Sequence, residues 1–140
     1  MPPIPNTLRA TITEAGQRRC GYCLTQEAVI GMPMEIDHII PVAAGGASTE
    51  DNLWLACPRC NRTKGTQTHA VDPQSGARMR IFNPRAQVWG EHFAWEDAGV
   101  CVVGLTAEGR ATVAALDMNN RFVVRARRVW VLWGWHPPKL

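Results

Sequence analysis

The chain has 140 residues, of which 46% are hydrophobic and 19% charged, and its formal net charge is +3. This balance is too apolar and too weakly charged for a disordered chain, and no apolar run approaches the roughly 18 residues of a membrane-spanning helix. The first residues lack a basic segment followed by an apolar one, so we expect a cytoplasmic protein that is neither secreted nor bound to a membrane.

The first half of the chain predicts a helix, a β-hairpin and a second helix. Apolar residues recur with helical spacing over residues 7–17, which predicts a helix. Residues 33–41 have the pattern of a strand bracketed by prolines, and residues 53–56 that of a strand returning beside it. A short helix is expected over about residues 59–66, where Gly65 would end it.

The second half predicts more strands and two further helices. The expected elements are a strand at 79–82, a hairpin formed by 91–95 and 100–105, and helices at about 107–118 and 121–133. Thr106 and Asn120 precede the two helices and are expected to cap them. We therefore expect a core at residues 1–76 and a C-terminal extension at residues 77–140 that packs on it.

The last predicted helix has two distinct faces. One face is aromatic and apolar and is expected in the core; it carries Phe122, Ala126, Val129, Trp130 and Trp133. Another carries arginines at positions i, i+4 and i+7: Arg121, Arg125 and Arg128. Such an arginine stripe is equally consistent with a solvated face and with a face that contacts phosphates.

Basic residues concentrate in two segments. Residues 59–85 and residues 121–140 each carry a net charge of +5, whereas residues 1–58 carry −3 and residues 86–120 carry −4. Two basic segments in a nearly neutral protein fit a polyanionic partner such as nucleic acid, with a solvated surface as the alternative.

Four of the five cysteines form two pairs with metal-ligand spacing. Cys20 and Cys23 make one C-x-x-C, and Cys57 and Cys60 make another, each with turn-forming residues. Cys101 stands alone in an apolar run and is expected in the core. An odd number of cysteines without a secretion signal argues against a disulfide framework. Two such pairs are typical of four thiolates around a structural Zn²⁺, whereas reduced or redox-active cysteines are the alternative.

Residues between the two cysteine pairs, and just after the second pair, have the chemistry of phosphodiester hydrolysis. Such hydrolysis needs a base that deprotonates the attacking water and a cation that binds the phosphate. His38 has a suitable pKa class for the base, and Asp37 and Asn61 offer the hard oxygen ligands that Mg²⁺ or Mn²⁺ prefers. Lys64, one helical turn beyond Asn61, is placed to contact the same nucleic-acid backbone.

The order of these motifs resembles the HNH endonuclease family in its zinc-containing form. The resemblance rests on Cys-x-x-Cys, Glu-Ile-Asp-His-Ile-Ile-Pro, Gly-Gly, Asp-Asn-Leu and Cys-x-x-Cys-Asn-x-x-Lys, in that order over residues 15–66. It implies an α+β fold built on a zinc-stabilised ββα-metal unit. It also implies that His38 is the general base, that Asp37 and Asn61 ligate the catalytic metal, and that Asn52 holds the hairpin loop and orients the base.

The sequence therefore predicts a metal-dependent endonuclease that hydrolyses DNA, with structural Zn²⁺ and catalytic Mg²⁺ or Mn²⁺. The C-terminal remainder resembles the extension of some small bacterial HNH proteins. The basic side chains expected to contact DNA are Arg59, Arg62, Lys64, Arg121, Arg125 and Arg128. A non-catalytic zinc module that binds nucleic acid is the alternative, and the presence of Asp37, His38 and Asn61 together favours the enzyme.

Four further side chains near these motifs have simpler expected roles. Glu35 is either an exposed structural carboxylate or a neighbour of the active site. His69 and His92 are expected to be structural, with a substrate contact by His69 as the lesser alternative. Trp54 is expected in the core beneath the hairpin.

Overall fold

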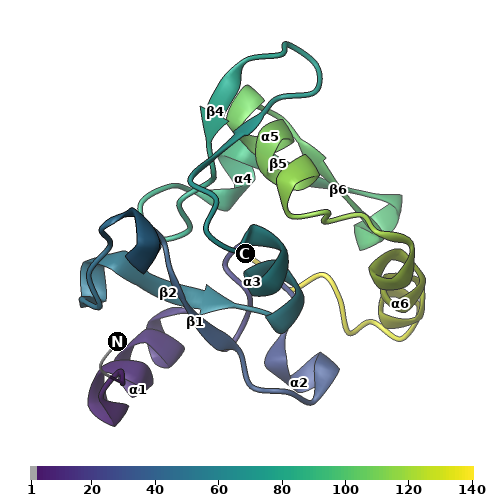
Figure 1. The fold of residues 1–140 in the computed structure, drawn as a ribbon. Coiled ribbons are helices and arrows are strands. Elements are labelled where there is room, and N and C mark those ends of the chain that lie inside the picture. The colour runs from purple at the N-terminus through teal and green to yellow at the C-terminus, as the bar shows by residue number, and fades with distance from the viewer. Residues whose placement is uncertain (1–2) are drawn as a thin grey trace.

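The computed structural model describes residues 3–140, whose arrangement is shown in Figure 1. The first half contains α1 (Asn6–Ala15), α2 (Glu27–Ile30), β1 (Glu35–His38), β2 (Leu53–Ala56) and α3 (Pro58–Lys64). The second half contains β3 (His69–Val71), β4 (Arg78–Arg80), α4 (Trp89–His92), β5 (Phe93–Glu96), β6 (Cys101–Gly104), α5 (Ala107–Ala115) and α6 (Arg121–Leu132). Short 3₁₀ turns lie at Val42–Ala44, Glu50–Asn52 and Asp97–Gly99.

The β1–β2 hairpin and α3 form the ββα unit that positions the site. β1 pairs antiparallel with β2, with His38 opposite Leu53, and α3 lies across the hairpin in Figure 1. The strand β1 is shorter than expected because the backbone of Ile40 bonds to the side chain of Asn52 instead of extending the strand. The mixture of small sheets and helices around four clustered cysteines confirms the α+β zinc-type fold.

The hairpin of β3 and β4 was not expected in full, because the sequence pattern predicts only its second strand. β3 has only three residues, too few for a period-2 pattern to stand out. His69 lies in β3 opposite Arg80, and the two strands stand on either side of the expected boundary after residue 76. Backbone hydrogen bonds therefore link the expected core and extension.

Buried residues from both halves share one hydrophobic core. Its fully or nearly fully buried members include Ile12, Tyr22, Leu53, Leu55, Phe82, Phe93, Leu116 and Met118. Trp89 Nε1 donates a hydrogen bond of 2.8 Å to the carbonyl of Tyr22, which ties α4 to the first cysteine turn. At the C-terminus, Gln26 Nε2 donates to the carbonyl of Trp135 at 2.8 Å, so the end of the chain packs back on the first half.

The buried face of the C-terminal helix α6 differs from the one predicted. Asn120 caps it as expected, since its Oδ1 accepts hydrogen bonds from the backbone of Phe122 and Val123. However, Phe122 and Trp133 are each 67% exposed and Val129 is 50% exposed, so the prediction of a core position is wrong for these three residues, whereas Ala126 and Trp130 are half-buried. The buried residues of the helix are Val123 and Arg127 instead.

Burial of Arg127 explains this different rotation of α6. Its Nη1 donates to the carbonyl of Val100 at 3.2 Å and to Oδ1 of Asn119 at 3.3 Å. The guanidinium also lies 5.5 Å from the ring centroid of Trp95, at cation–π distance. An arginine that makes these contacts turns its own face inward and leaves Phe122 outside.

Two other expected core residues lie nearer the surface. Trp54 is half-buried, with the guanidinium of Arg85 5.4 Å from its ring centroid. Cys101 is also half-buried, in β6. Among residues 3–140, no helix is both long enough and apolar enough to cross a membrane.

The buried His136 makes stability depend on pH. Its ring is 3% exposed and lies 4.6 Å from Trp95 and 5.7 Å from Trp130, measured between ring centroids. Burial, with the nearby charge of Arg127 acting in the same direction, lowers the pKa of His136 to about 4. In the unfolded chain the pKa of His136 is about 6.5. Between about pH 6.5 and pH 4, His136 therefore binds a proton in the unfolded chain but not in the native state.

We expect the native state to lose stability as the pH falls from about 6.5 towards 4. His136→Phe removes this proton uptake, so between pH 7.5 and pH 5 the wild type should lose about 2 kcal/mol more than the variant. Urea unfolding of both proteins at the two pH values measures the difference. Equal losses would show that His136 does not control this pH dependence.

Candidate active site and metal centre

The two cysteine turns come together at one end of the β1–β2 hairpin. Cys57 directly follows β2, and the backbone N–H of Gly21 donates to the carbonyl of Leu55 at 2.9 Å. The ligand atoms of Cys20, Cys23, Cys57 and Cys60 all lie within 4.8 Å of one another and are buried. The Sγ atoms of Cys23 and Cys57 are 3.7 Å apart. Four sulfurs about 2.3 Å from a tetrahedral Zn²⁺ lie about 3.8 Å apart, so the cluster fits zinc.

Nearby groups support negative charge on these sulfurs. The backbone N–H of Cys60 donates to Sγ of Cys57 at 3.4 Å, and Nη2 of Arg59 donates to Sγ of Cys60 at 3.4 Å. Burial raises the pKa of the Cys20 thiol, because no water solvates its thiolate. A divalent cation would replace the proton that burial otherwise holds on the Cys20 sulfur.

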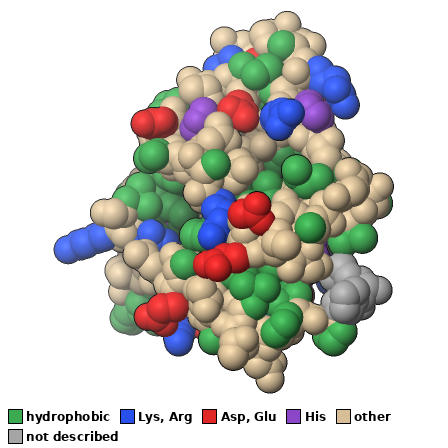
Figure 2. All heavy atoms as spheres, turned by 90° about the vertical axis from the view of Figure 1, so that its left-hand side faces the viewer, with side chains coloured by type: hydrophobic (Ala, Val, Ile, Leu, Met, Phe, Trp, Pro, Cys, Tyr) green, Lys and Arg blue, Asp and Glu red, His purple; other side chains and the backbone are tan. Residues whose placement is uncertain are grey.

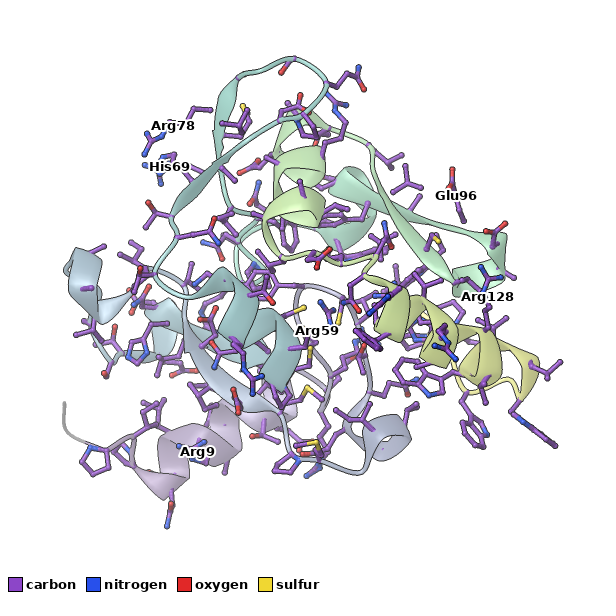
Figure 3. All side chains as sticks on the ribbon, turned by 45° about the vertical axis from the view of Figure 1, so that its right-hand side comes forward. Arg9, Arg59, His69, Arg78, Glu96 and Arg128 are labelled. Carbon is purple, nitrogen blue, oxygen red and sulfur yellow. The ribbon has the colours of Figure 1, made fainter. Side chains whose placement is uncertain are left out.

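Arg59 is engaged inside the protein rather than free to meet DNA, which revises its expected role. Its Nη1 donates to the backbone carbonyls of Leu116 at 3.1 Å and Asp117 at 3.2 Å. Figure 3 shows Arg59 between α3 and α6. It therefore links the second cysteine turn to the segment that precedes α6.

Asn52 holds the loop that connects the two strands of the hairpin. Its Oδ1 accepts from the backbone N–H of Ile40 at 2.9 Å, and its Nδ2 donates to the carbonyls of Ile40 at 3.0 Å and Ala47 at 2.9 Å. A Cβ at Gly46 would lie 1.7 Å from the Ile40 carbonyl oxygen, so the close approach of the loop requires glycine there.

His38, at the end of β1, is oriented by this loop. Its Nε2 lies 2.9 Å from Oγ of Ser48, and the ring is half-buried. Nδ1 makes no hydrogen bond with the described residues, so it can accept a proton in the tautomer that carries hydrogen on Nε2. No sequence motif marks Ser48, a lone serine ten residues from His38.

Asp37 lies on the opposite side of β1, because side chains alternate along a strand. Its carboxylate is 4% exposed; the hydroxyl of Tyr22 donates to Oδ2 at 2.6 Å and Nζ of Lys64 donates to Oδ1 at 3.2 Å. The Lys64 ammonium also donates to the carbonyl of His38 at 2.9 Å. Lys64 is 1% exposed, so it pairs with Asp37 inside the protein instead of reaching a phosphate as expected.

Asn61 contacts the exposed carboxylate of Glu35 across the gap between α3 and β1. Its Nδ2 donates to Oε1 of Glu35 at 2.8 Å. Because Nδ2 makes this bond, the amide oxygen Oδ1 is turned away from Glu35 and is available as a ligand. Glu35 thus neighbours the site, and with Asp37 it forms the face of β1 that α3 covers.

The remaining expected residues lie outside this cluster. His69 and Arg78 both lie at the outer edge of the β3–β4 hairpin in Figure 3, and Nδ1 of His69 is 2.9 Å from Oγ1 of Thr68. His92 contacts the hydroxyl of Thr106 at 2.7 Å, a structural role.

On the face drawn in Figure 2, basic and acidic side chains are interspersed. Arg62 on α3 is exposed, as are the three stripe residues of α6, Arg121, Arg125 and Arg128.

Comparison with known proteins assigns the segment that carries this site. The family model described as HNH endonuclease matches residues 20–67. CRISPR-associated endonuclease Cas9 of Corynebacterium diphtheriae is 37% identical over 59 residues, which are 38% of this chain and 5% of that protein. The type IV methyl-directed restriction enzyme EcoKMcrA of Escherichia coli is 48% identical over 29 residues, 21% of this chain and 10% of that protein. The chain spans a tenth or less of these relatives. The matched segment contains the cysteine cluster, β1, β2 and α3, and residues 20–67 thus form a domain of the HNH endonuclease family.

Proposed function

We propose that this protein is a metal-dependent endonuclease that hydrolyses DNA phosphodiester bonds. The observation that carries the proposal is His38, held at Nε2 by Ser48 in a loop fixed by Asn52, with Nδ1 left to accept a proton. In this reaction, Nδ1 takes a proton from water while the oxygen of that water attacks phosphorus. The bond from phosphorus to the 3′ oxygen breaks and that oxygen takes up a proton from solvent water, which leaves 5′-phosphate and 3′-hydroxyl ends.

Asn61 and Asp37 are the residues proposed to hold the catalytic Mg²⁺ or Mn²⁺. Amide and carboxylate oxygens suit these hard cations, which also keep several waters. Asn61 Oδ1 is the more accessible donor, whereas Asp37 is buried and its charge is already balanced by Lys64. The remaining lone pairs of the Asp37 carboxylate can still coordinate the cation. When bound, the cation supplies charge stabilisation at the phosphate and the leaving oxygen.

Glu35 is proposed to be a positioning residue for Asn61. The hydrogen bond from Nδ2 to Glu35 fixes which end of the amide faces the cation. Partners of this kind typically change metal affinity by about 10- to 100-fold. Glu35→Ala is therefore expected to weaken Mn²⁺ binding by about tenfold, and Asn61→Ala by at least as much.

Electron paramagnetic resonance of free Mn²⁺ measures this affinity without any cleavage assay. Glu35→Gln keeps an acceptor for Nδ2 and is expected to bind Mn²⁺ like the wild type. Excess Mn²⁺ should partly restore cleavage by Asn61→Ala, because mass action offsets a weakened site. Unchanged Mn²⁺ affinity in Glu35→Ala would remove the positioning role.

The three arginines on the exposed face of α6 are proposed to contact DNA phosphates. Each phosphate contact contributes about 0.9 to the slope of log affinity against log salt. Replacing Arg121, Arg125 and Arg128 with Gln is therefore expected to lower this slope by about 3. Fluorescence anisotropy at several salt concentrations measures it.

Arg9→Gln provides a control for loss of charge alone, compared with the single variant Arg128→Gln. Arg9 is exposed on α1, on the other side of the molecule from Arg128 in Figure 3. We expect Arg128→Gln to lower the slope by about 1 and Arg9→Gln to leave it unchanged. Equal effects of the two single variants would assign the stripe to a solvated face.

The main experiment is incubation of the protein with supercoiled plasmid, with and without Mg²⁺ or Mn²⁺. We expect nicked or linear plasmid only with the metal, and intact plasmid when a chelator is added. A His38→Ala protein purified in the same way controls for a contaminating nuclease. Binding of DNA without cleavage under every metal condition would instead favour a non-catalytic zinc module.

A further inference from the structure

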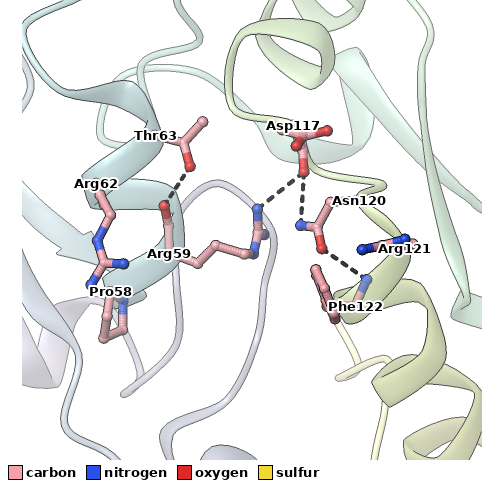
Figure 4. Close-up of a pocket in the computed structure, with 8 residues that line it drawn as sticks. All are labelled: Pro58, Arg59, Arg62, Thr63, Asp117, Asn120, Arg121 and Phe122. Carbon is pink, nitrogen blue, oxygen red and sulfur yellow. Dashed lines mark hydrogen bonds between the residues drawn. The ribbon is translucent and has the colours of Figure 1, made fainter.

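A pocket of about 830 Å³ lies between α3 and α6, and its lining does not include His38, Asp37 or Asn61. Its lining residues are Pro58, Arg59, Arg62, Thr63, Asp117, Asn120, Arg121 and Phe122, drawn in Figure 4. This volume is within the range of ligand-binding pockets. We propose that the pocket binds one unpaired nucleotide of the DNA substrate, a proposal that rests on the proposed DNA cleavage.

The walls of the pocket are held in place by hydrogen bonds. Arg59 joins α3 to the carbonyl of Asp117, and Asn120 donates to the same carbonyl at 3.1 Å. Asn120 also accepts from the backbone N–H of Phe122 at 3.0 Å, which fixes the first turn of α6. The pocket is therefore formed before any ligand arrives, so binding does not have to order its walls.

Two exposed arginines face the pocket from opposite sides. In Figure 4, Arg62 comes from α3 and Arg121 from α6. Neither forms an ion pair with any of residues 3–140. Asp117 is the single acidic residue of the lining. Guanidinium groups that form no ion pair suit a phosphate, for which arginine provides several donors in one plane.

Phe122 gives the pocket an aromatic surface. Its ring is 67% exposed and lies 4.8 Å, centroid to guanidinium carbon, from Arg121. Proteins that bind single-stranded nucleic acid combine basic grooves with aromatic rings on which bases stack. Bases inside a duplex are already stacked and paired, so only an unpaired base can lie against this ring.

The pocket and the candidate active site lie on two faces of the same helix. Asn61 turns towards Glu35 on β1, whereas its neighbour Arg62 lines the pocket. A helix with its side chains is about 10 Å wide, which is about three base steps along a DNA strand. The bound nucleotide would therefore lie within a few nucleotides of the bond that is cut.

The test uses the non-cleaving His38→Ala protein and two DNA duplexes of one sequence. One carries 5-iodouracil as a single-nucleotide bulge, and the other carries it paired. We expect the bulged DNA to bind about tenfold more tightly and to photocross-link at Phe122, mapped by mass spectrometry. Adding Phe122→Ala should abolish the cross-link and the tenfold preference, whereas Phe122→Tyr should keep both.

Leu132→Ala is the matched control, because Leu132 is 80% exposed on the same helix but lies outside the pocket. It should retain the preference and the cross-link. Equal binding of bulged and paired DNA, or an equal effect of Phe122→Ala and Leu132→Ala, would overturn the proposal. Plasmid cleavage without bulge preference removes the pocket alone, whereas Phe122-dependent binding without cleavage keeps the pocket and removes the nuclease proposal.

Discussion

Replacing His38 with alanine is expected to reduce plasmid cleavage by about 10²- to 10⁴-fold at saturating Mg²⁺. The imidazole is proposed to take the proton from water, and Oγ of Ser48 lies 2.9 Å from its Nε2. Fold and zinc content should be unchanged, because the ring is half-buried and does not belong to the cysteine cluster. The affinity for DNA should also be retained. Single-turnover cleavage rates, with anisotropy for binding, measure both parts of the prediction.

Two further variants, Ser48→Ala and His69→Ala, test whether the loss of cleavage is specific to His38. Ser48→Ala removes the hydroxyl 2.9 Å from Nε2 and should lower the cleavage rate less than His38→Ala, since the base remains but is less well oriented. His69→Ala should cleave like the wild type, because His69 lies at the outer edge of the β3–β4 hairpin. If His38→Ala cleaves like the wild type and His69→Ala does not, the base is His69 and the proposed assignment fails.

Loss of zinc is expected to unfold the HNH domain. Binding of structural Zn²⁺ by small zinc domains contributes about 10–16 kcal/mol, whereas whole domains are stable by only about 5–15 kcal/mol. Cys57 lies at the junction of β2 and α3 and contacts Cys23 across the cluster. Cys57→Ser should therefore lose both the metal and the cooperative melting of the β1–β2 hairpin with α3.

The measurements are zinc per chain by elemental analysis and thermal melting by circular dichroism. We expect one Zn²⁺ per wild-type chain, none in Cys57→Ser, and melting at a much lower temperature when a strong chelator is added. Cys101→Ser is the matched control, because Cys101 is half-buried in β6 and outside the cluster. A wild-type chain without zinc, or a Cys57→Ser protein that melts like the wild type, would contradict a structural zinc site.

Features that depend only on residues close together in the chain were predictable from the amino-acid sequence. The spacing of the two C-x-x-C pairs predicted one cysteine cluster, because each pair fixes its own turn and the hairpin between them returns the chain. The two helix caps were also predicted: Thr106 accepts from the backbone of Gly109 at 3.0 Å, and Asn120 from that of Phe122. Caps act within three residues, so local sequence suffices.

Contacts between side chains far apart in the chain follow from the packing of the folded protein. The contacts of Lys64 with Asp37 and of Asn61 with Glu35 each join residues about 26 positions apart, and no local pattern encodes them. The rotation of α6 was likewise misjudged. A helical period shows which residues share a face, but not which face meets the rest of the protein. In α6 the hydrogen bonds and cation–π contact of Arg127 accompany its burial, and Phe122 is left at the surface.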